Sequence, residues 1–475
     1  MPDNAYNVIP YPSFPRNKTH PDRLAAVGTL FGMTPAPVTN CRYLEIGCGD
    51  GGNLVPMAYW LPGSRFLGVD LADEPIAAGR RAIASLDLGN LTLEAADLRN
   101  IGPEAGEFDY IVAHGLYSWV PADVRDRLLA VCRERLAPQG IAYISYNAYP
   151  GRHVRQMLRE MMLYHVRNLE DPVQRIEQGR WFLEFLRKSR LLSPAWGELV
   201  DQQVAALLKH AGGGLYHDDL AEVNDSVYFH EFAAHARRHG LQYLGEADFH
   251  EMFDPQGSLA WLKDDVLERE QYLDFLRIRL FRQTLLCREE VALNRELRPA
   301  AMRRFLFSAP AKTVEGGQIE GLHGVRISAL HDAVKQVTAA LGEVYPFPLS
   351  FEELVPYAGD PASLEEIVFA LFTGGFADVH VYQFPCADAV TAKPRASRLA
   401  RYQASVSRHA ASACHGIVEL EEINRFLVML LDGTRTHREI AEALAKAPGG
   451  PTREQIREGL PKSLEWLAHE GLLEG

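Results

Sequence analysis

The chain has 475 residues, of which 47% are hydrophobic and 23% are charged, and its formal net charge is −13. This length exceeds what a single hydrophobic core supports, so two or three domains are expected, and the composition excludes an extensively disordered chain. The negative charge argues against a protein that binds nucleic acid through bulk electrostatics.

Alternating apolar strands and amphipathic helices fill the first third of the chain, a pattern typical of a parallel α/β sheet. The predicted strands cover 42–46, 65–70, 91–97, 108–113 and 141–146, and the predicted helices cover 53–61, 74–86 and 121–136. Pro56 is tolerated only in a first helical turn, so the loop before it should extend to about Asn53. Ahead of the sheet, Thr19-His20-Pro21-Asp22 provides an N-cap, a proline at the helix start and an early carboxylate.

After the fifth strand the pattern becomes helical and then returns to strands. Residues 151–215 are predicted to form a helical insertion or lid, with the triplet Gly212–Gly214 at its end. A helix over 229–238 should stop at Gly240, and it precedes a strand at 241–247, a helix near 268–279 and a strand at 281–287. The predicted fold class is therefore α/β, with a Rossmann-like seven-stranded sheet interrupted after its fifth strand.

Two helix-rich units follow from about residue 300. Helices at 350–357 and 363–372 and a strand at 377–382 form a helix-turn-helix with a wing, and helices at 420–431, 436–445 and 452–470 form a second unit. The second helix of the first unit carries Glu365 and Glu366 but no Lys or Arg, so a winged-helix-like scaffold for protein contact or dimerisation is favoured over DNA binding. The polar segment 392–408 between the units is predicted to be a linker or an exposed helix, and removal of 301–475 is expected to spare ligand binding by the sheet.

A glycine-rich loop with three nearby acids indicates the ligand. Gly47-Cys48-Gly49-Asp50-Gly51-Gly52 follows a strand and precedes a helix, a pattern that nicotinamide, flavin and S-adenosylmethionine sites share. Glu45 would repel a diphosphate but suits a ligand with an ammonium group and a sulfonium. Asp70, at the end of the second strand, can accept both ribose hydroxyls, and Asp97 can accept a hydrogen bond from an adenine amine while Leu98 covers the ring. The pattern favours S-adenosylmethionine over NAD. The predicted cofactor-binding residues are Glu45, Gly47, Gly49, Gly51, Asp70, Leu71, Asp97, Leu98 and His114.

On these residues, the first half of the chain resembles the class I S-adenosylmethionine-dependent methyltransferases. A narrower resemblance, to bacterial methyltransferases with a methyltransferase regulatory domain, covers nearly the whole chain. It rests on five stretches, which are Tyr11-Pro12 through Thr19–Leu24, His114–Pro121, Tyr146–Gly151, Tyr216–Leu220 and Phe281–Leu286. The characterised relatives are protein-lysine methyltransferases that act on bacterial outer-membrane proteins, so the resemblance implies a lysine acceptor.

The predicted organisation has four parts. Residues 1–150 form the S-adenosylmethionine-binding methyltransferase core, and 151–215 form the helical insertion or lid. Residues 216–298 form a regulatory region that completes the sheet, and 299–475 form a C-terminal winged-helix-like region.

The acceptor site is predicted in the segments after the fourth and fifth strands. A lysine ammonium must lose its proton before it can be methylated, which costs roughly 4 kcal/mol at neutral pH. Aromatic faces and oxygen acceptors would lower that cost. Tyr117 and Tyr146 are predicted as orienting residues or proton acceptors, and Trp119, Asn147 and Tyr149 as substrate-binding walls. Packing beneath the helical insertion is the alternative role for each of these residues.

Two absences narrow the chemistry. Ala113-His114-Gly115-Leu116 replaces the Asn/Asp-Pro-Pro-Tyr/Phe motif of exocyclic-amine methyltransferases, and no Pro-Cys nucleophile is present, which disfavours nucleobase methylation. His235 and His239 have the i, i+4 spacing of zinc ligands, but the sequence places no third ligand beside them, so no metal is predicted.

The leading hypothesis is a methyltransferase that acts on lysine side chains of a protein. The alternatives are a methyltransferase for a small molecule or peptide natural product, and an adenosylmethionine-binding assembly protein with little catalysis. The expected partner is a protein or peptide substrate, with a small molecule as the alternative and a homodimer left open. The six scattered cysteines include no C-x-x-C pair, and the chain has neither a leader-like start nor an apolar run of about 18 residues. A cytoplasmic protein without membrane insertion is therefore expected.

Overall fold

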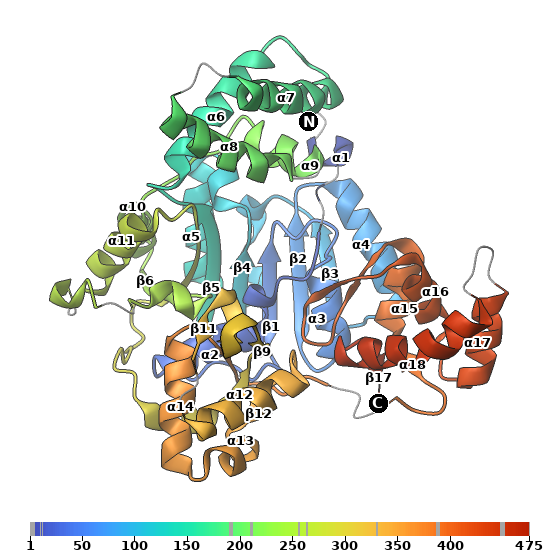
Figure 1. The fold of residues 1–475 in the computed structure, drawn as a ribbon. Helices are drawn as coiled ribbons and strands as arrows, with labels where there is room; N and C mark the ends of the chain where they lie inside the picture. The colour runs from blue at the N-terminus through green and yellow to red at the C-terminus, as the bar shows by residue number, and fades with distance from the viewer. Residues whose placement is uncertain are drawn as a thin grey trace.

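The computed structural model describes residues 5–9, 11, 13–189, 193–209, 212–254, 257–262, 265–328, 331–385, 390–446 and 452–474. Its centre is a seven-stranded sheet with the order β3-β2-β1-β4-β5-β7-β6 (Figure 1). The strands are β1 (Arg42–Ile46), β2 (Arg65–Asp70), β3 (Leu91–Ala95), β4 (Phe108–Ala113), β5 (Leu136–Asn147), β6 (Leu241–Glu246) and β7 (Phe281–Arg288). The first five pair in parallel, and β7 runs antiparallel to both β5 and β6. The predicted seven-stranded α/β sheet is confirmed.

Helices cover both faces of this sheet. The helices are α2 (Pro21–Leu30), α3 (Leu54–Trp60), α4 (Asp73–Leu86), α5 (Ala122–Arg135) and α10 (Phe229–Arg238). Successive strand residues alternate between the faces, since Tyr43 packs in a cluster with α2, α3 and α4, whereas Leu44 packs in a cluster with α5. Helix α3 begins at Leu54, so that Pro56 lies in its first turn, as predicted.

Three long helices follow β5 and lie beside the short N-terminal helix α1 (Ala5–Val8) at the top of Figure 1. These helices, α6 (Arg152–His165), α7 (Pro172–Lys188) and α8 (Pro194–Leu208), share a separate apolar cluster that includes Leu158 and Leu183. The triplet Gly212–Gly214 was expected to end the helical segment, but it forms the helical turn α9 and continues into a π-helix over Leu215–Asp219. Glycine costs a helix only about 1 kcal/mol per residue, and the burial of Leu215 and Leu220 in the same cluster offsets that cost.

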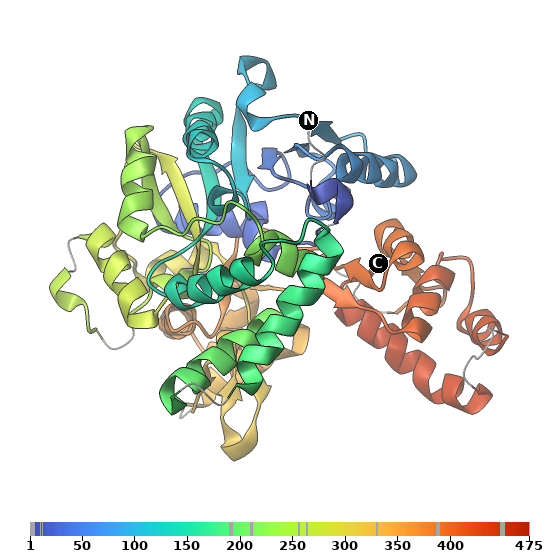
Figure 2. The same ribbon diagram turned by 90° about the horizontal axis from the view of Figure 1, so that it is seen from above.

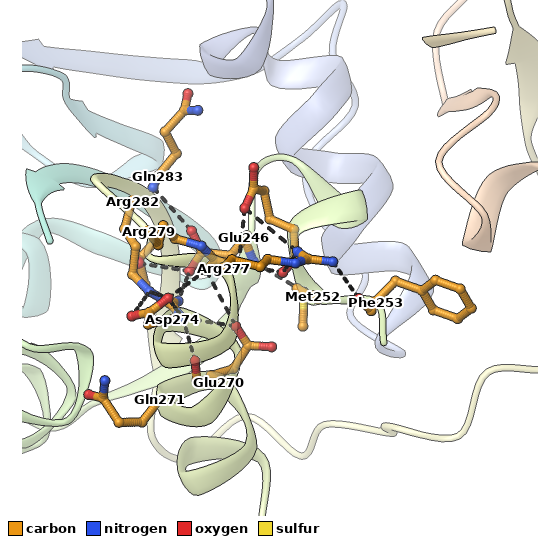
Figure 3. A network of polar contacts seen from close by, with 12 residues as sticks. Glu246, Met252, Phe253, Glu270, Gln271, Asp274, Arg277, Arg279, Arg282 and Gln283 are labelled. Atoms are coloured by element: carbon orange, nitrogen blue, oxygen red, sulfur yellow. Dashed lines mark hydrogen bonds and ion pairs between the residues drawn. The ribbon is translucent and has the colours of Figure 1, made fainter. Parts of the chain in front are cut away.

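A buried arginine joins the last strands of the sheet to α11 (Val266–Arg277). Arg282 is fully buried and donates to Asp274 at 2.9 and 3.1 Å, to Glu246 at 2.6 Å and to Glu270 at 3.1 Å (Figure 3). Removing one partner of such a buried pair leaves an uncompensated charge and costs about 3–5 kcal/mol. The network therefore fixes β6, β7 and α11 as one unit beside β5.

The C-terminal part forms two helical units, one below the sheet in Figure 1 and one that extends to one side of it in Figure 2. The first contains α12 (Asp332–Val344), α13 (Phe351–Ala358) and α14 (Pro361–Thr373), with the small sheet of β8 (Leu306–Ser308), β12 (Leu349–Ser350) and β13 (Asp378–His380). The second contains α15 (Arg398–Val406), α16 (Glu422–Leu430), α17 (His437–Ala445), α18 (Arg453–His469) and the hairpin of β15 (His409–Ala411) and β16 (Ile417–Glu419). The remaining short strands are β9 (Lys312–Thr313), β10 (Ile319–Glu320), β11 (Arg326–Ile327), β14 (Arg395–Ala396) and β17 (Leu473–Glu474).

One sequence-based expectation for this part is wrong. The segment 392–408 is neither a linker nor an exposed helix, because it contains α15, whose Leu399, Ala400 and Ala404 are fully buried. The charged residues of this helix lie on its outer face and make the segment polar on average, so the narrow apolar face was not recognised in the sequence. Among the described residues, no helix is long and apolar enough to cross a membrane.

Candidate active site

A cavity of about 710 Å³ lies at the carboxyl ends of the parallel strands. Its wall follows the strand order, with Asp97 after β3, Asp70 at the end of β2, Gly47 after β1, His114 after β4 and Asn147 at the end of β5. Open α/β sheets bind ligands at this edge, at the point between β1 and β4 where the strand order reverses. The volume lies within the range of about 300–1,000 Å³ that is usual for small-molecule sites.

The glycine loop forms the floor of the cavity and holds Asp70. Gly47, Gly49 and Gly51 have φ values of 79°, 56° and 76°, a region that glycine enters without strain. The Gly49 N–H donates to Oδ2 of Asp70 at 2.8 Å, and the Ala72 N–H donates to Oδ1 at 2.9 Å. Gly51 does not line the cavity; a Cβ there would approach Leu93 to 3.0 Å, so its role is close packing.

Glu45 is a buried carboxylate in the cavity wall and is only 4% exposed. Among the described residues its one hydrogen-bond donor is the amide of Asn53, whose Nδ2 lies 3.1 and 3.2 Å from the two carboxylate oxygens. Burial raises the pKa of Glu45 to about 8, although the Asn53 hydrogen bond and the charge of Arg16 oppose the rise. Such a carboxylate has unused acceptor capacity and gains from a cationic ligand.

Asp97 and two leucines form the far end of the cavity. Asp97 caps the 3₁₀ turn over Leu98–Asn100 and pairs with Arg99 at 2.6 Å, which lowers the pKa of Asp97. Leu98 is buried, whereas Leu71 is 54% exposed and also lines the cavity. This end therefore combines an ionised acceptor with two apolar surfaces that can hold a flat ring.

The opposite end of the cavity is formed by Asn147, Trp119, Phe281, Arg152 and Asp218. Asp218 accepts a hydrogen bond from the Tyr11 hydroxyl at 3.2 Å, and burial raises the pKa of Asp218 to about 6. Arg152 is 6% exposed, and burial lowers its pKa to about 10.

His114 lies between the two ends. Its Nδ1 is 2.8 Å from the Tyr143 hydroxyl, which itself donates to Gln283 at 2.9 Å. Burial lowers the pKa of His114 to about 3, so the ring is neutral, donates from Nδ1 to Tyr143 and keeps Nε2 as an acceptor.

The N-terminal segment covers the cavity, which the sequence did not reveal. Tyr6, Tyr11 and Arg16 all line it. The Tyr6 ring stacks on His217 with centroids 4.0 Å apart, and Nε2 of His217 donates to the Ile9 carbonyl at 2.6 Å. The segment that begins at Tyr11 belongs to the stretches shared with regulatory-domain methyltransferases, and that was the only signal for it.

Comparison with known proteins identifies the family. Three family models match, a methyltransferase domain over 44–140, a predicted methyltransferase regulatory domain over 213–288 and a PKMT C-terminal winged helix domain over 392–449. An uncharacterized protein of Rickettsia prowazekii is 32% identical over 473 residues, which cover 93% of this chain and 85% of that protein. The chain is a class I S-adenosylmethionine-dependent methyltransferase with a regulatory domain.

Two solved structures support the same assignment over nearly the full length. PKMT2 from Rickettsia typhi is 27% identical to this methyltransferase, and the TM-score is 0.86. The structural alignment covers 98% of this chain and 100% of that chain. The complex of the same protein with AdoHcy gives 26% identity and the same TM-score and coverage.

The residues around the cavity fit S-adenosylmethionine. Glu45 is a buried acceptor that lacks a cationic partner in hydrogen-bond contact among the described residues, which suits an ammonium group. Asp70 is held by two backbone N–H groups at the strand end where ribose hydroxyls are bound in this fold. The N–H groups of Gly47, Gly49 and Gly51 already donate to acceptors within the protein, so the methyltransferase site suits a cationic nucleoside rather than a dinucleotide.

The two tyrosines predicted as catalytic do not line the cavity. Tyr146 is fully buried, stacks on Phe232 at 4.2 Å, and its hydroxyl lies 3.1 Å from Oγ1 of Thr284. Tyr117 is 3% exposed, and its hydroxyl lies 2.8 Å from Nδ1 of His235. Both hydroxyls are therefore committed to partners in the protein, and this geometry does not support direct contact with an acceptor.

Of the three residues predicted to bind the substrate, two line the cavity and one does not. Trp119 and Asn147 line the cavity, and Nδ2 of Asn147 donates to Asn224 at 2.8 Å. Tyr149 does not line it, because its ring stacks on His153 with centroids 4.1 Å apart.

The structure places a third potential metal ligand beside His235 and His239, which the sequence did not indicate. Asp126 of α5 lies beside both, and the three potential ligand atoms are within 4.8 Å of one another. Asp126 accepts hydrogen bonds from Nε2 of His239 at 2.9 Å and of His235 at 3.3 Å. The trio lies outside the cavity, and these hydrogen bonds satisfy it without an ion.

Proposed function

We propose that this methyltransferase transfers a methyl group to lysine side-chain amines of a protein. The observation that carries the proposal is the likeness to PKMT2, a protein lysine methyltransferase by its name, because it extends over 98% of the chain at 27% identity. A match to a PKMT winged helix domain in the C-terminal part supports a protein acceptor in the same way.

The cofactor would occupy the wall from Asp97 to Glu45. In this arrangement Asp97 and the two leucines bind adenine, Asp70 accepts from the ribose hydroxyls and Glu45 binds the ammonium group. Arg16 lines the cavity close enough to influence the charge of Glu45, which suits the carboxylate of the same amino-acid moiety. When bound, S-adenosylmethionine would supply a methyl group on a sulfonium, so that a neutral amine could form an N–C bond to this methyl group as the C–S bond breaks and the neutral thioether S-adenosylhomocysteine leaves.

The opposite wall would receive the lysine. A free lysine has a pKa of about 10.4, so deprotonation at pH 7 costs between about 4 and 5 kcal/mol. Arg152 opposes a second positive charge there, and Trp119 and Phe281 exclude water, so each lowers the pKa of an incoming amine. Asp218, with a pKa of about 6, is ionised at neutral pH, so it attracts the ammonium group and accepts its proton.

Methyl transfer from labelled S-adenosylmethionine into a native bacterial lysate tests this function. Acid hydrolysis of the labelled protein should yield methyllysine. Asp218→Asn should reduce the incorporation at least tenfold while cofactor affinity stays within about twofold. Asp201→Asn, which removes an exposed carboxylate of α8, is the matched control and should retain full incorporation.

Two outcomes would contradict the proposal. Label found only in small molecules would assign the enzyme to another substrate class. Label in protein that is released by mild base would indicate a carboxyl ester rather than an amine product.

A further inference from the structure

A buried hydrogen-bond chain through Asn53 connects the C-terminal part to the cofactor wall, which is the part of the cavity from Asp97 to Glu45. Asn53 precedes α3 and is 3% exposed. Its Oδ1 accepts from the Arg16 backbone N–H at 2.9 Å, and its Nδ2 donates to Glu45 at 3.1 Å and to Oγ1 of Thr19 at 3.0 Å. Because a backbone N–H can only donate, it fixes the orientation of the amide and directs Nδ2 toward Glu45.

The second donor to Asn53 comes from 362 residues away in the sequence. Nε2 of His415 lies 2.8 Å from Oδ1 of Asn53. His415 is 3% exposed, and burial lowers its pKa to about 3, so it is neutral and carries one ring proton. Since Oδ1 accepts only, that proton is on Nε2, and His415 is a permanent donor to the amide.

The local backbone aims this ring. His415 lies in the turn between β15 and β16 with a φ of 59°, a left-handed conformation that is uncommon for a residue other than glycine. Ser412 closes the turn, because its carbonyl accepts the His415 N–H at 3.0 Å and its Oγ accepts the Gly416 N–H at 3.0 Å. Such strain persists only where the surrounding contacts determine it.

The C-terminal part is anchored to the same side of the core by buried charges. Asp22 of α2 accepts the N–H groups of Val381 at 2.7 Å and Tyr382 at 2.9 Å, and it pairs with His380 at 2.7 Å. Arg23 pairs with Asp378. These contacts hold the first C-terminal unit against the start of α2, and Ala413, two residues before His415, packs in one buried cluster with Phe347 and Phe384 of that unit. The His415 turn is therefore not a loose peripheral contact.

We propose that His415 is a positioning residue for the cofactor, acting through Asn53 to hold the carboxylate of Glu45 where it binds the ammonium group. The inference rests on the proposed role of Glu45. On this proposal the C-terminal part influences cofactor affinity, although none of its described residues lines the cavity. Without the His415 donor, Oδ1 keeps the Arg16 N–H at 2.9 Å and a longer contact with the Thr19 hydroxyl at 3.3 Å, so the amide is held less firmly in the orientation that directs Nδ2 toward Glu45.

Calorimetric binding of S-adenosylhomocysteine to the full-length protein tests the proposal. His415→Ala should raise the Kd about tenfold, because it weakens one charge-assisted hydrogen bond, the proposed contact between Glu45 and the ammonium group. His415→Gln, whose amide can donate from a position close to that of Nε2, should restore most of the affinity. His437→Ala is the matched control, because it removes a histidine that donates from Nε2 to the Thr391 carbonyl in the same C-terminal part, and it should leave the Kd unchanged.

A double variant separates positioning from general damage to the fold. If His415 acts through Asn53, His415→Ala added to Asn53→Ala should cause little further loss of affinity. At saturating cofactor the kcat of His415→Ala should remain within about twofold of the wild-type value, because only cofactor binding depends on the contact. Additive losses in the double variant, or failure of His415→Gln to restore affinity, would overturn the proposal.

A comparison of the His415→Ala and Glu45→Gln variants distinguishes failure of this proposal from failure of the proposed cofactor site. Loss of affinity on Glu45→Gln with unchanged affinity on His415→Ala would refute only the positioning role. Unchanged affinity on Glu45→Gln would refute the cofactor assignment itself. Neither binding measurement depends on the identity of the methyl acceptor.

Discussion

Replacement of Glu45 by glutamine should stabilise the cofactor-free protein and weaken cofactor binding. Burial raises the pKa of Glu45 from 4.5 to about 8 in the folded protein. Because the pKa is raised in the folded state, the protonated carboxyl group stabilises that state, and this stabilisation is fully present below pH 4.5. It is lost as the pH rises through about 8, because the folded state must then bury a charged carboxylate. Each unit of pKa shift is worth about 1.4 kcal/mol, so the fully charged side chain, well above pH 8, destabilises the folded state by about 5 kcal/mol.

Glutamine does not titrate, so the variant avoids this penalty. The stability advantage of Glu45→Gln should therefore grow by about 2.3 kcal/mol between pH 6 and pH 8 and level off above about pH 9. For a unit of about 150–250 residues this corresponds to a widening of the Tm difference by about 5–10 °C. Thermal unfolding without cofactor, measured from pH 5 to pH 9, checks the slope, and Glu94→Gln on the exposed face of β3 is the control that should show no such trend.

Cofactor binding should change in the opposite direction. At pH 7 most wild-type molecules carry a protonated Glu45, so pairing with an ammonium group should release close to one proton. Calorimetry in buffers of different ionisation enthalpy measures that release, which Glu45→Gln should abolish together with at least tenfold of the affinity. A Tm difference that is independent of pH would refute the burial argument, even if the affinity fell.

Three further substitutions follow from the same contacts. Asp70→Asn should weaken cofactor binding about a hundredfold, because an amide replaces the carboxylate acceptor, and an unchanged Kd by calorimetry would refute the ribose assignment. Tyr146→Phe should keep kcat within about twofold and lower stability by about 1 kcal/mol, because the hydroxyl contacts Thr284; a large loss of kcat would return Tyr146 to the reacting centre. Removal of 301–475 should abolish cofactor binding or folding, contrary to the expectation from sequence, because Asp22 and Arg23 would lose their buried partners, and a folded truncated protein with native affinity would contradict this.

The sheet could be predicted from sequence because its signals are local. Strands buried on both faces are short apolar runs, and each was bounded by glycine, proline or a helix start. The strand ends also carried the acids of the cofactor wall, so Glu45, Asp70 and Asp97 could be placed together before the structure was known. Their convergence follows from the parallel order of β1, β2 and β3.

In the wall proposed to receive the acceptor, only Trp119 and Asn147, which follow β4 and end β5, could be predicted in this way. The rest of that wall is assembled from distant segments. Tyr11 and Asp218 are 207 residues apart in the chain, and neither follows a strand of the parallel sheet. Tyr146 was misplaced for a different reason. Side chains alternate along a strand, and Ala142, Ile144 and Tyr146 all pack in the cluster under α5, so the parity of β5 already directed Tyr146 away from the cavity.

Two parts of the chain outside the parallel strands, the unit of β6, β7 and α11 and the C-terminal part, support different walls of the cavity. Phe281, the first residue of β7, lines the acceptor wall, and the adjacent Arg282 fixes β7 through three buried carboxylates. The C-terminal part instead reaches the cofactor wall through His415 and Asn53. Each support relies on buried polar groups, whose cost is high when one partner is removed, so neither part can detach from the sheet without disturbing the wall it holds. Both parts therefore belong to the methyltransferase site, although the residues that we propose to bind the cofactor come from the sheet and the segment before it.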